Sequence, residues 1–192
     1  MSIFNMNKIN IRTGNCLDIL PTMEAGSVNC CVTSPPYFGL RDYGNDEQIG
    51  LEETPEAFVQ ALVDVFREVK RVLADDGTLW LNLGDSYARQ GGKESNQSRH
   101  WDGRKADAGA MHSTRHVDNL GGGLKPKDLI GIPWRVALAL QQDGWYLRQD
   151  IIWSKPNPMP ESVTDRCTKA HEYIFLLSKS PKYFYDAEAI KE

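Results

Sequence analysis

A short apolar run that ends in two prolines is the feature that most limits how this chain can fold. Residues 28–33 are mostly small and apolar, which is typical of a strand covered on both faces. Ser34-Pro35-Pro36-Tyr37, here called the Ser-Pro-Pro-Tyr segment, follows directly and stops the strand, because proline lacks an N–H and has a fixed φ. Ligand crevices of open α/β sheets form at such strand ends. The sequence therefore predicts an α/β fold with a ligand site here.

The chemistry of this segment suits an amino group that must give up hydrogens. The two prolines present backbone carbonyl acceptors from a stiff backbone and donate nothing. An exocyclic amine of a nucleobase is a poor nucleophile, because its lone pair is delocalised into the ring. Acceptors around that nitrogen favour a pyramidal geometry with a localised lone pair, as preorganised dipoles do where charge develops. We expect the ring of Tyr37 to lie flat on such a base.

A second interpretation of the same four residues is an ordinary turn, or a polyproline stretch that binds a partner domain. Short motifs match by chance often enough for this alternative to count. The strand-like run before the segment favours the catalytic interpretation, since a surface ligand motif would not need it.

Strand and helix patterns alternate early in the chain, and its end is richer in strands. Thr54 can cap a helix, Pro55 suits the first turn, and apolar residues then recur every three or four positions until Asp75. The patterns predict helices over 16–23, 54–74 and 128–142, and strands over 9–12, 28–33, 78–83, 146–153, 172–178 and 183–185. This order predicts a Rossmann-like α/β sheet, mostly parallel with an antiparallel edge.

Length and composition narrow the class of protein. The 192 residues predict a single domain over 1–192 with a sizeable core. No apolar run approaches the roughly twenty residues of a membrane span, and the N-terminus lacks the apolar core of a signal peptide. Four cysteines without Cys-x-x-Cys spacing and four histidines without ligand spacing indicate no metal, and cysteines that are reduced and mostly buried. Together these features indicate a cytoplasmic protein without a membrane partner.

A polar stretch with several glycines, from about 88 to 125, interrupts the alternating pattern. From Ala88 to Lys127 the chain holds eight basic and four acidic residues, a local net charge of +4, although the whole chain carries −4. A loop this long is usually functional or disordered, and local charge steers a polyanion. Two interpretations stay open: an arm that binds DNA phosphates through Arg99, Arg104 and Lys105, or a solvated insertion.

Several segments in a fixed order carry a resemblance to a known family. Residues 14–20 lead to residues 27–37, which end in the Ser-Pro-Pro-Tyr segment, and residues 71–85, 151–160 and 169–179 follow. These segments resemble the DNA amino-methyltransferases of the cytosine-N4 and adenine-N6 type. Their order resembles the β-class arrangement, in which the catalytic motif precedes the cofactor loop. The resemblance covers almost the whole chain except about 88–125.

The resemblance implies an enzyme that transfers a methyl group from S-adenosylmethionine to the exocyclic amine of a base flipped out of double-stranded DNA. It assigns Ser34 and the Pro35 carbonyl to the amine, with Pro36 and Tyr37 completing the catalytic set. A base stacked on Tyr37 would gain about 1–3 kcal/mol. Serine here, where adenine enzymes have aspartate or asparagine, favours cytosine N4 as the target. The family further implies a prokaryotic or phage-encoded restriction-modification system.

The cofactor side of the resemblance is incomplete. Gly14-Asn15 matches a Gly-Asp pair that lies near the cofactor's adenine in the family, which makes Asn15 and the adjacent Cys16 cofactor-binding candidates. Asn15 fits a helix N-cap equally well. The family's Phe-x-Gly-x-Gly loop does not occur in this sequence, and in the β-class order it would follow residue 192. We therefore expect an N-terminal portion of an enzyme, or half of a split enzyme whose partner chain carries the loop.

Residues outside the Ser-Pro-Pro-Tyr segment are further candidates. The resemblance places Trp153 and Lys155 near the target base or the DNA, with rim packing and a solvated charge as the alternatives. Arg41 can contact phosphate, and Asp42 can order the loop after the segment. Asp85 follows a predicted strand, where it either lines the crevice or serves as a turn carboxylate.

Three functions therefore remain open at this point. The first is a cytosine-N4 DNA methyltransferase, and the second keeps the chemistry but targets adenine N6 or an RNA base amine. The third is a catalytically incomplete DNA-binding half that works only with a partner chain.

Overall fold

The computed structural model describes residues 9–45, 47–88, 123–158 and 160–191. Four strands form one sheet in the order β1-β2-β4-β3, where β1 is Val28–Thr33, β2 is Leu73–Leu83, β3 is Tyr146–Ser154 and β4 is His171–Ser178. β1 pairs parallel with β2, and β4 pairs antiparallel with both β2 and β3. β1, β2 and β3 therefore run in one direction and β4 runs against them. The α/β sheet with an antiparallel part is confirmed, but the sheet is mixed and not mostly parallel, because β4 lies between β2 and β3 and makes both of its pairings antiparallel.

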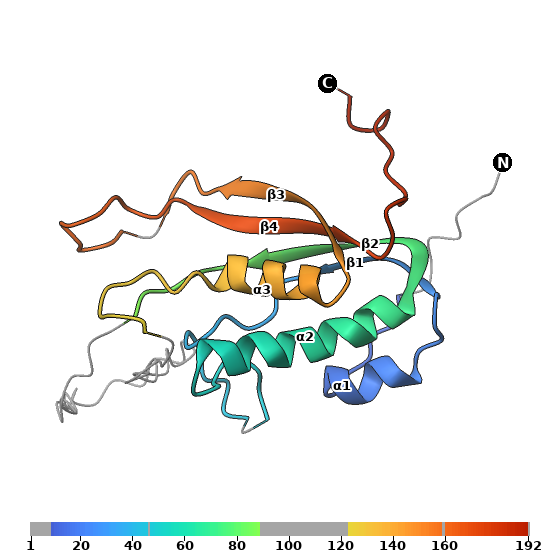
Figure 1. Cartoon of the computed structure of the whole chain (residues 1–192), viewed down its shortest axis with the longest axis horizontal. Coiled ribbons are helices and arrows are strands. Elements are labelled where there is room, and N and C mark those ends of the chain that lie inside the picture. Colours follow the sequence, from blue (N-terminus) through green and yellow to red (C-terminus); the bar gives the residue numbers. More distant parts are fainter. Residues whose placement is uncertain (1–8, 46, 89–122, 159, 192) are drawn as a thin grey trace.

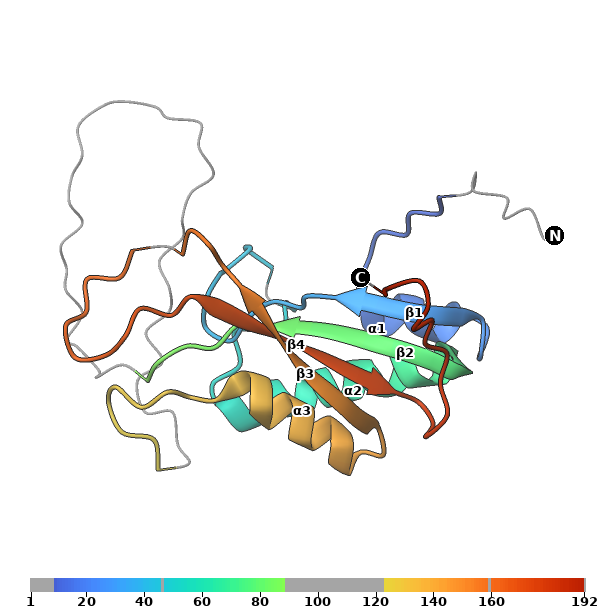
Figure 2. The ribbon, with the colours of Figure 1, turned by 90° about the horizontal axis from the view of Figure 1, so that it is seen from above.

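The helices lie on one face of the sheet (Figures 1 and 2). They are α1 (Cys16–Ile19), the short 3-10 helix η1 (Leu20–Thr22), α2 (Pro55–Val72) and α3 (Ile132–Gln142). α2 begins as its sequence predicts, because the Thr54 side chain accepts a hydrogen bond from the Ala57 N–H at 3.1 Å. Its apolar side chains pack on every second residue of the two central strands, β2 and β4. The core cluster that they form includes Phe58, Leu62, Phe66, Leu79, Leu81, Leu83, Phe175 and Leu177.

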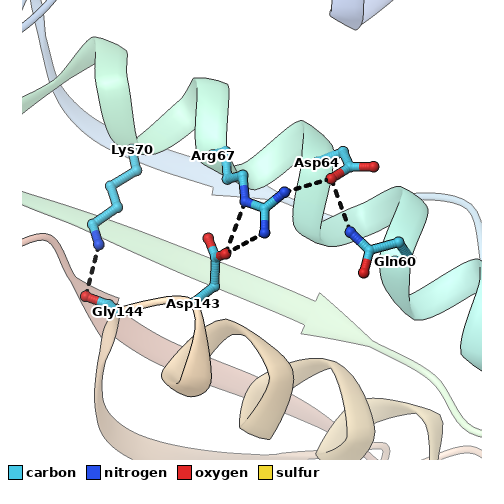
Figure 3. Close-up of polar contacts among 6 residues, drawn as sticks. All are labelled: Gln60, Asp64, Arg67, Lys70, Asp143 and Gly144. Carbon is cyan, nitrogen blue, oxygen red and sulfur yellow. Dashed lines mark hydrogen bonds and ion pairs between the residues drawn. The ribbon is translucent and has the colours of Figure 1, made fainter.

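α2 and α3 are joined by polar contacts at the end of α3 (Figure 3). The Arg67 guanidinium donates to Asp143 Oδ1 at 2.6 and 2.8 Å, and its remaining nitrogen pairs with Asp64 in the preceding turn at 2.9 Å. One turn further along α2, Lys70 Nζ donates to the Gly144 carbonyl at 2.7 Å. These contacts fix the turn that leads from α3 into β3.

Several predicted elements differ from the structure at their ends or in kind. The strand predicted over 78–83 begins at Leu73 as β2, and the helix predicted over 54–74 ends at Val72. The helix predicted over 16–23 is divided into α1 and η1, because Pro21 cannot donate the hydrogen bond that would continue an α-helix. The helix predicted from 128 begins at Ile132, after Gly131, which has a φ of 78°. The strands predicted over 9–12 and 183–185 are wrong: residues 9–12 form no strand and 183–185 are irregular.

The cysteines also correct an expectation. All four are free, as predicted, but Cys16, Cys30 and Cys167 are exposed and Cys31 alone is partly buried. Cys30 and Cys31 point to opposite faces of β1, and the structure covers only the face that carries Cys31 with helices. The expectation of buried cysteines assumed a strand covered on both faces.

This difference predicts unequal reactivity of two adjacent thiols. Burial, and to a lesser extent the neighbouring Cys30, raise the pKa of the Cys31 thiol to about 11. Because the thiolate is the reactive form, Cys31 should react roughly 100-fold more slowly with maleimide at pH 8 than an ordinary cysteine. Labelling rates of Cys30→Ser and Cys31→Ser variants, measured by mass spectrometry, check this. Equal labelling of the two variants would contradict it.

None of the helices in the described part of the chain is long and apolar enough to cross a membrane. Across the same residues, no group of three or more His, Cys, Asp or Glu side chains could hold a metal ion.

Candidate active site

The Ser-Pro-Pro-Tyr segment lies where four strand ends meet. Thr33, the last residue of β1, pairs with Leu81 of β2, and Leu83 at the end of β2 pairs with Tyr173 of β4. Ser154, the last residue of β3, pairs with His171, the first of β4. The carboxyl ends of β1, β2 and β3 therefore meet at one edge of the sheet, which is the arrangement that the predicted ligand site requires.

The loop after β1 is held at two points. Phe38 is buried and its ring packs against Phe58 of α2, with 5.5 Å between the ring centroids. The Gly39 N–H donates to the Gly50 carbonyl at 2.8 Å, and a Cβ on Gly50 would lie 3.2 Å from the Pro36 side chain. The two prolines are thus fixed between a strand and a core anchor. The Pro35 carbonyl has no hydrogen-bond donor within the described part of the chain.

Two hydroxyl groups of the segment form a hydrogen-bonded cluster with β2 and β4. Tyr37 Oη lies 2.9 Å from Asn82 Oδ1 and 3.0 Å from Glu172 Oε2. Ser34 Oγ lies 3.2 Å from Asn82 Oδ1 and 3.4 Å from Tyr37 Oη. The amide of Asn82 is oriented by its Nδ2, which donates to the Tyr173 carbonyl at 3.0 Å.

The ring of Tyr37 is held by packing as well as by its hydroxyl. Gly84, just after β2, lies directly against it, since a Cβ there would come within 2.4 Å of the ring carbon Cε2. Burial is the main cause that raises the pKa of Tyr37 above its usual value. The hydrogen bond from Ser34 lowers the pKa in part, and the Glu172 carboxylate raises it further. Tyr37 therefore keeps its proton at neutral pH.

Lys155 reaches the same cluster from the end of β3. Its Nζ lies 3.5 Å from Glu172 Oε1 and 3.4 Å from the centroid of the Trp153 ring. The cation is thus shared between a carboxylate and an aromatic face. Glu172 in turn joins Lys155 on one oxygen to Tyr37 on the other.

Asp85 makes the contacts of a turn carboxylate. Its Oδ1 accepts hydrogen bonds from the N–H groups of Ser86, Gly131 and Ile132 at 2.9, 3.0 and 3.0 Å. Gly131 and Ile132 are the N-cap and first residue of α3, so Asp85 caps this helix from a distant part of the chain. The cap links the end of β2, where the cluster lies, to α3.

Replacing this cap should destabilise the fold. Asp85→Ala leaves two N–H groups at the start of α3 without their acceptor, which should lower the free energy of unfolding by about 1–2 kcal/mol. Asp85→Asn retains a carbonyl oxygen at the same position and should lose less than half as much. Urea unfolding of the two variants measures the difference. Similar losses for both would show that the negative charge, and not the acceptor, stabilises the helix.

The remaining candidates from the sequence lie apart from the cluster or outside the described residues. Asn15 is the N-cap of α1, with its Oδ1 accepting from the Leu17 N–H at 3.0 Å, and the adjacent Cys16 is exposed. Asp42 orders the loop by accepting from the Gly44 N–H at 2.8 Å, and Arg41 beside it is exposed. Three predicted phosphate contacts, Arg99, Arg104 and Lys105, lie outside the described residues.

Sequence reasoning missed Asn82, Gly84 and Glu172 as parts of the site. Asn82 had a detectable signal, because a polar amide interrupts an otherwise apolar strand two residues before a turn. Glu172 had a weaker one, as the first residue of the strand predicted over 172–178. Neither signal shows which side chain the residue contacts, since the contacts join positions 45 and 135 residues apart in the chain.

Comparison with solved structures assigns the architecture. The PvuII DNA methyltransferase (cytosine-N4-specific) superposes with a TM-score of 0.60 at 17% sequence identity, over 92% of this chain and 51% of that one. The Thermus thermophilus protein TTHA0409, solved in complex with S-adenosyl-L-methionine, superposes with a TM-score of 0.57 at 22% identity, over 92% of this chain and 55% of that one. The fold is therefore that of a Rossmann-like methyltransferase domain.

Sequence comparison then gives the family. Residues 28–192 match the family described as DNA methylase, N6_N4_Mtase, and this chain belongs to it. Its relatives include the Type II methyltransferases M.Cfr9I of Citrobacter freundii, 54% identical over 97% of this chain, and M.SmaI of Serratia marcescens, 53% identical over 98%. The chain spans about three fifths of the length of these relatives, 60% and 62%.

Proposed function

We propose that this chain carries the base-binding half of a site-specific DNA methyltransferase that modifies cytosine N4. The observation that carries the proposal is the hydrogen-bonded cluster of the Ser34 and Tyr37 hydroxyls at the strand ends, with the Pro35 carbonyl next to Ser34 in the chain. It offers acceptors to an amine and a flat ring to a base. The names of the relatives, Type II methyltransferases, support the reaction class. The cytosine-N4-specific structure that shares the fold, together with serine at position 34, supports the target atom.

The proposed reaction needs few groups on the protein. A cytosine turned out of the duplex stacks on Tyr37, and its amine donates hydrogens to Ser34 Oγ and to the Pro35 carbonyl. These acceptors hold the nitrogen lone pair in line with the methyl group. They also stabilise the positive charge that develops on the nitrogen as the N–C bond forms, before the amine loses a proton. S-adenosylmethionine, when bound, would supply an electrophilic methyl group on a sulfonium: its S–CH3 bond would break as the N–CH3 bond forms, leaving a neutral thioether. The proton that the amine loses would pass through the acceptors around it to solvent.

The residues of this chain fit the amine side of that reaction better than the cofactor side. Asn15 and Cys16 remain our proposed cofactor contacts, although the described contacts of Asn15 are those of a helix cap. We propose that the glycine-rich cofactor loop expected for the family comes from elsewhere in the full-length protein or from a partner chain. The site would act on double-stranded DNA in the bacterial cytoplasm, with Arg41, Lys155 and the basic stretch around Arg99, Arg104 and Lys105 near phosphates.

A nucleoside analysis tests the proposal. The gene for the full-length protein is expressed in a bacterial host without DNA methyltransferases, and its DNA is digested to nucleosides for mass spectrometry. N4-methylcytosine should accumulate, and sequencing of the modified DNA should map it to one site. N6-methyladenine in its place would refute the cytosine assignment, and unmodified DNA from a host with folded protein would refute the function.

A further inference from the structure

The hydroxyl protons of Ser34 and Tyr37 are both directed into the protein. The two shortest contacts of Tyr37 Oη are to Asn82 Oδ1 and Glu172 Oε2, at 2.9 and 3.0 Å. The two contacts of Ser34 Oγ are to Asn82 Oδ1 and Tyr37 Oη, at 3.2 and 3.4 Å. The direction of each hydrogen bond follows from which of these atoms can donate.

Asn82 and Glu172 offer only acceptors to the two hydroxyls. The Asn82 amide nitrogen is used by the Tyr173 carbonyl at 3.0 Å, so the amide oxygen must face the hydroxyls. A carboxylate has no hydrogen to give, and Lys155 Nζ lies 3.5 Å from the other oxygen of Glu172, Oε1. The strand ends thus supply two acceptors and no donor.

The number of protons then fixes the direction at Ser34. Tyr37 keeps its single proton, because burial raises its pKa, and donates it to Glu172 or Asn82. Ser34 can then donate its own proton to Asn82 Oδ1 or to the Tyr37 oxygen, and both of these acceptors lie toward the sheet. With its proton turned inward, Ser34 presents lone pairs to whatever lies above the segment.

We propose that Asn82 and Glu172 are positioning residues that set the hydrogen-bond direction of Ser34, so that the site accepts an amine and rejects a carbonyl. The proposal rests on the proposed function, since it concerns the base that the Ser-Pro-Pro-Tyr segment receives. Cytosine carries an amine at C4 where uracil carries a carbonyl oxygen, and its N3 is an acceptor where that of uracil is an N–H donor. A lone pair facing a carbonyl oxygen leaves two acceptors opposed, which penalises the wrong base. The change of the cytosine-to-uracil ratio between variants at Asn82 and Glu172, and not the wild-type ratio alone, therefore reports on the group that faces Ser34.

The test compares the affinity of the full-length protein for two duplexes. One has cytosine at the methylation site and the other uracil, each opposite a mismatched base so that both turn out of the helix easily. The wild-type protein should bind the cytosine duplex at least tenfold more tightly. Asn82→Leu removes the acceptor that orients Ser34 and should bring this ratio below about threefold. A residue that only supports the fold would weaken both affinities together and leave the ratio unchanged.

Two further variants keep the test decisive if Asn82→Leu does not fold. Asn82→Asp keeps an acceptor toward Ser34 and should retain most of the preference for cytosine. Glu172→Gln has the same shape, but Lys155 attracts its carbonyl oxygen, so its amide turns a donor toward Tyr37 and should lower the ratio at least twofold. Asn29→Leu, at the amino end of β1, and Glu68→Gln, on α2, are the matched controls.

The outcomes separate this proposal from the function on which it rests. A wild-type protein that methylates its site, together with an unchanged cytosine-to-uracil ratio in Asn82→Leu and Glu172→Gln, overturns the positioning role alone. A wild-type protein that modifies no DNA overturns the function. A ratio that falls in both variants, with methylation retained by the wild type, supports both.

Discussion

Ser34→Ala should lower the single-turnover methylation rate of the full-length protein by about 10²–10³-fold, the usual cost of losing one preorganised polar group at a reacting centre. We expect the Ser34 hydroxyl to act on the amine alone, by holding it in line with the methyl group. Its loss should therefore raise the free energy of the transition state more than it weakens DNA binding. The affinity for DNA should therefore fall by less than tenfold. Neither the expected change in methylation rate nor the expected change in DNA affinity depends on the residues that bind the cofactor.

Rapid-quench measurements at saturating cofactor, together with DNA titrations, separate the two quantities. Ser27→Ala is the matched control, because it makes the same substitution just before the amino end of β1, where Ser27 Oγ donates to the Glu24 carbonyl at 2.7 Å. A large loss of DNA affinity with an unchanged rate in the bound complex would remove Ser34 from the catalytic contacts. It would leave the fold assignment as it stands.

The position of the site could be predicted from the sequence because it follows from local pattern. The apolar run over residues 28–33 predicts a strand, proline ends it, and strand ends of α/β sheets gather at one edge. The same kind of argument gives α2, where Thr54 and Pro55 mark the first turn. Local signals of this kind also gave the N-cap role of Asn15 and the turn role of Asp85 among the alternatives.

What the sequence could not supply is the partner of each polar group across the sheet. Asn82 meets Tyr37 because β1 and β2 pair in one register, and Glu172 joins them because β4 enters beside β2 and not beside β1. A slip of one residue in either pairing would turn these side chains to the other face. The burial of the cysteines was predicted wrongly for a related reason. The periodicity of a sequence does not show which face of a strand is covered by helices and which is exposed to solvent.

The packing of Tyr37 gives the second large expected effect, at Gly84. The φ of Gly84 is not in the left-handed region, so alanine is compatible with its backbone. The added methyl group, however, would lie 2.4 and 2.7 Å from two ring carbons of Tyr37, closer than real contacts allow. The ring must therefore move, and its hydroxyl would leave Asn82 and Glu172.

Gly84→Ala should destabilise the protein by about 1–3 kcal/mol, as overpacking does. It should also lower the methylation rate by at least 10²-fold, because the displaced ring takes the Ser34 network with it. Tyr37→Ala alone should cost about 1–3 kcal/mol of transition-state stabilisation, the value of one stack. The free energies of unfolding and the single-turnover rates of both single variants measure these losses.

The double variant Gly84→Ala/Tyr37→Ala decides whether the clash is the cause. Tyr37→Ala removes the three ring carbons that lie nearest to the added methyl group, so the stability cost of Gly84→Ala should disappear in the Tyr37→Ala background. A coupling of at least about 1 kcal/mol between the two sites is expected, since residues in direct contact are not additive. Equal costs of Gly84→Ala in both backgrounds would place the strain in the backbone after β2. Tyr37 would then be held by its hydroxyl alone, and the ring would be free to shift when a base stacks on it.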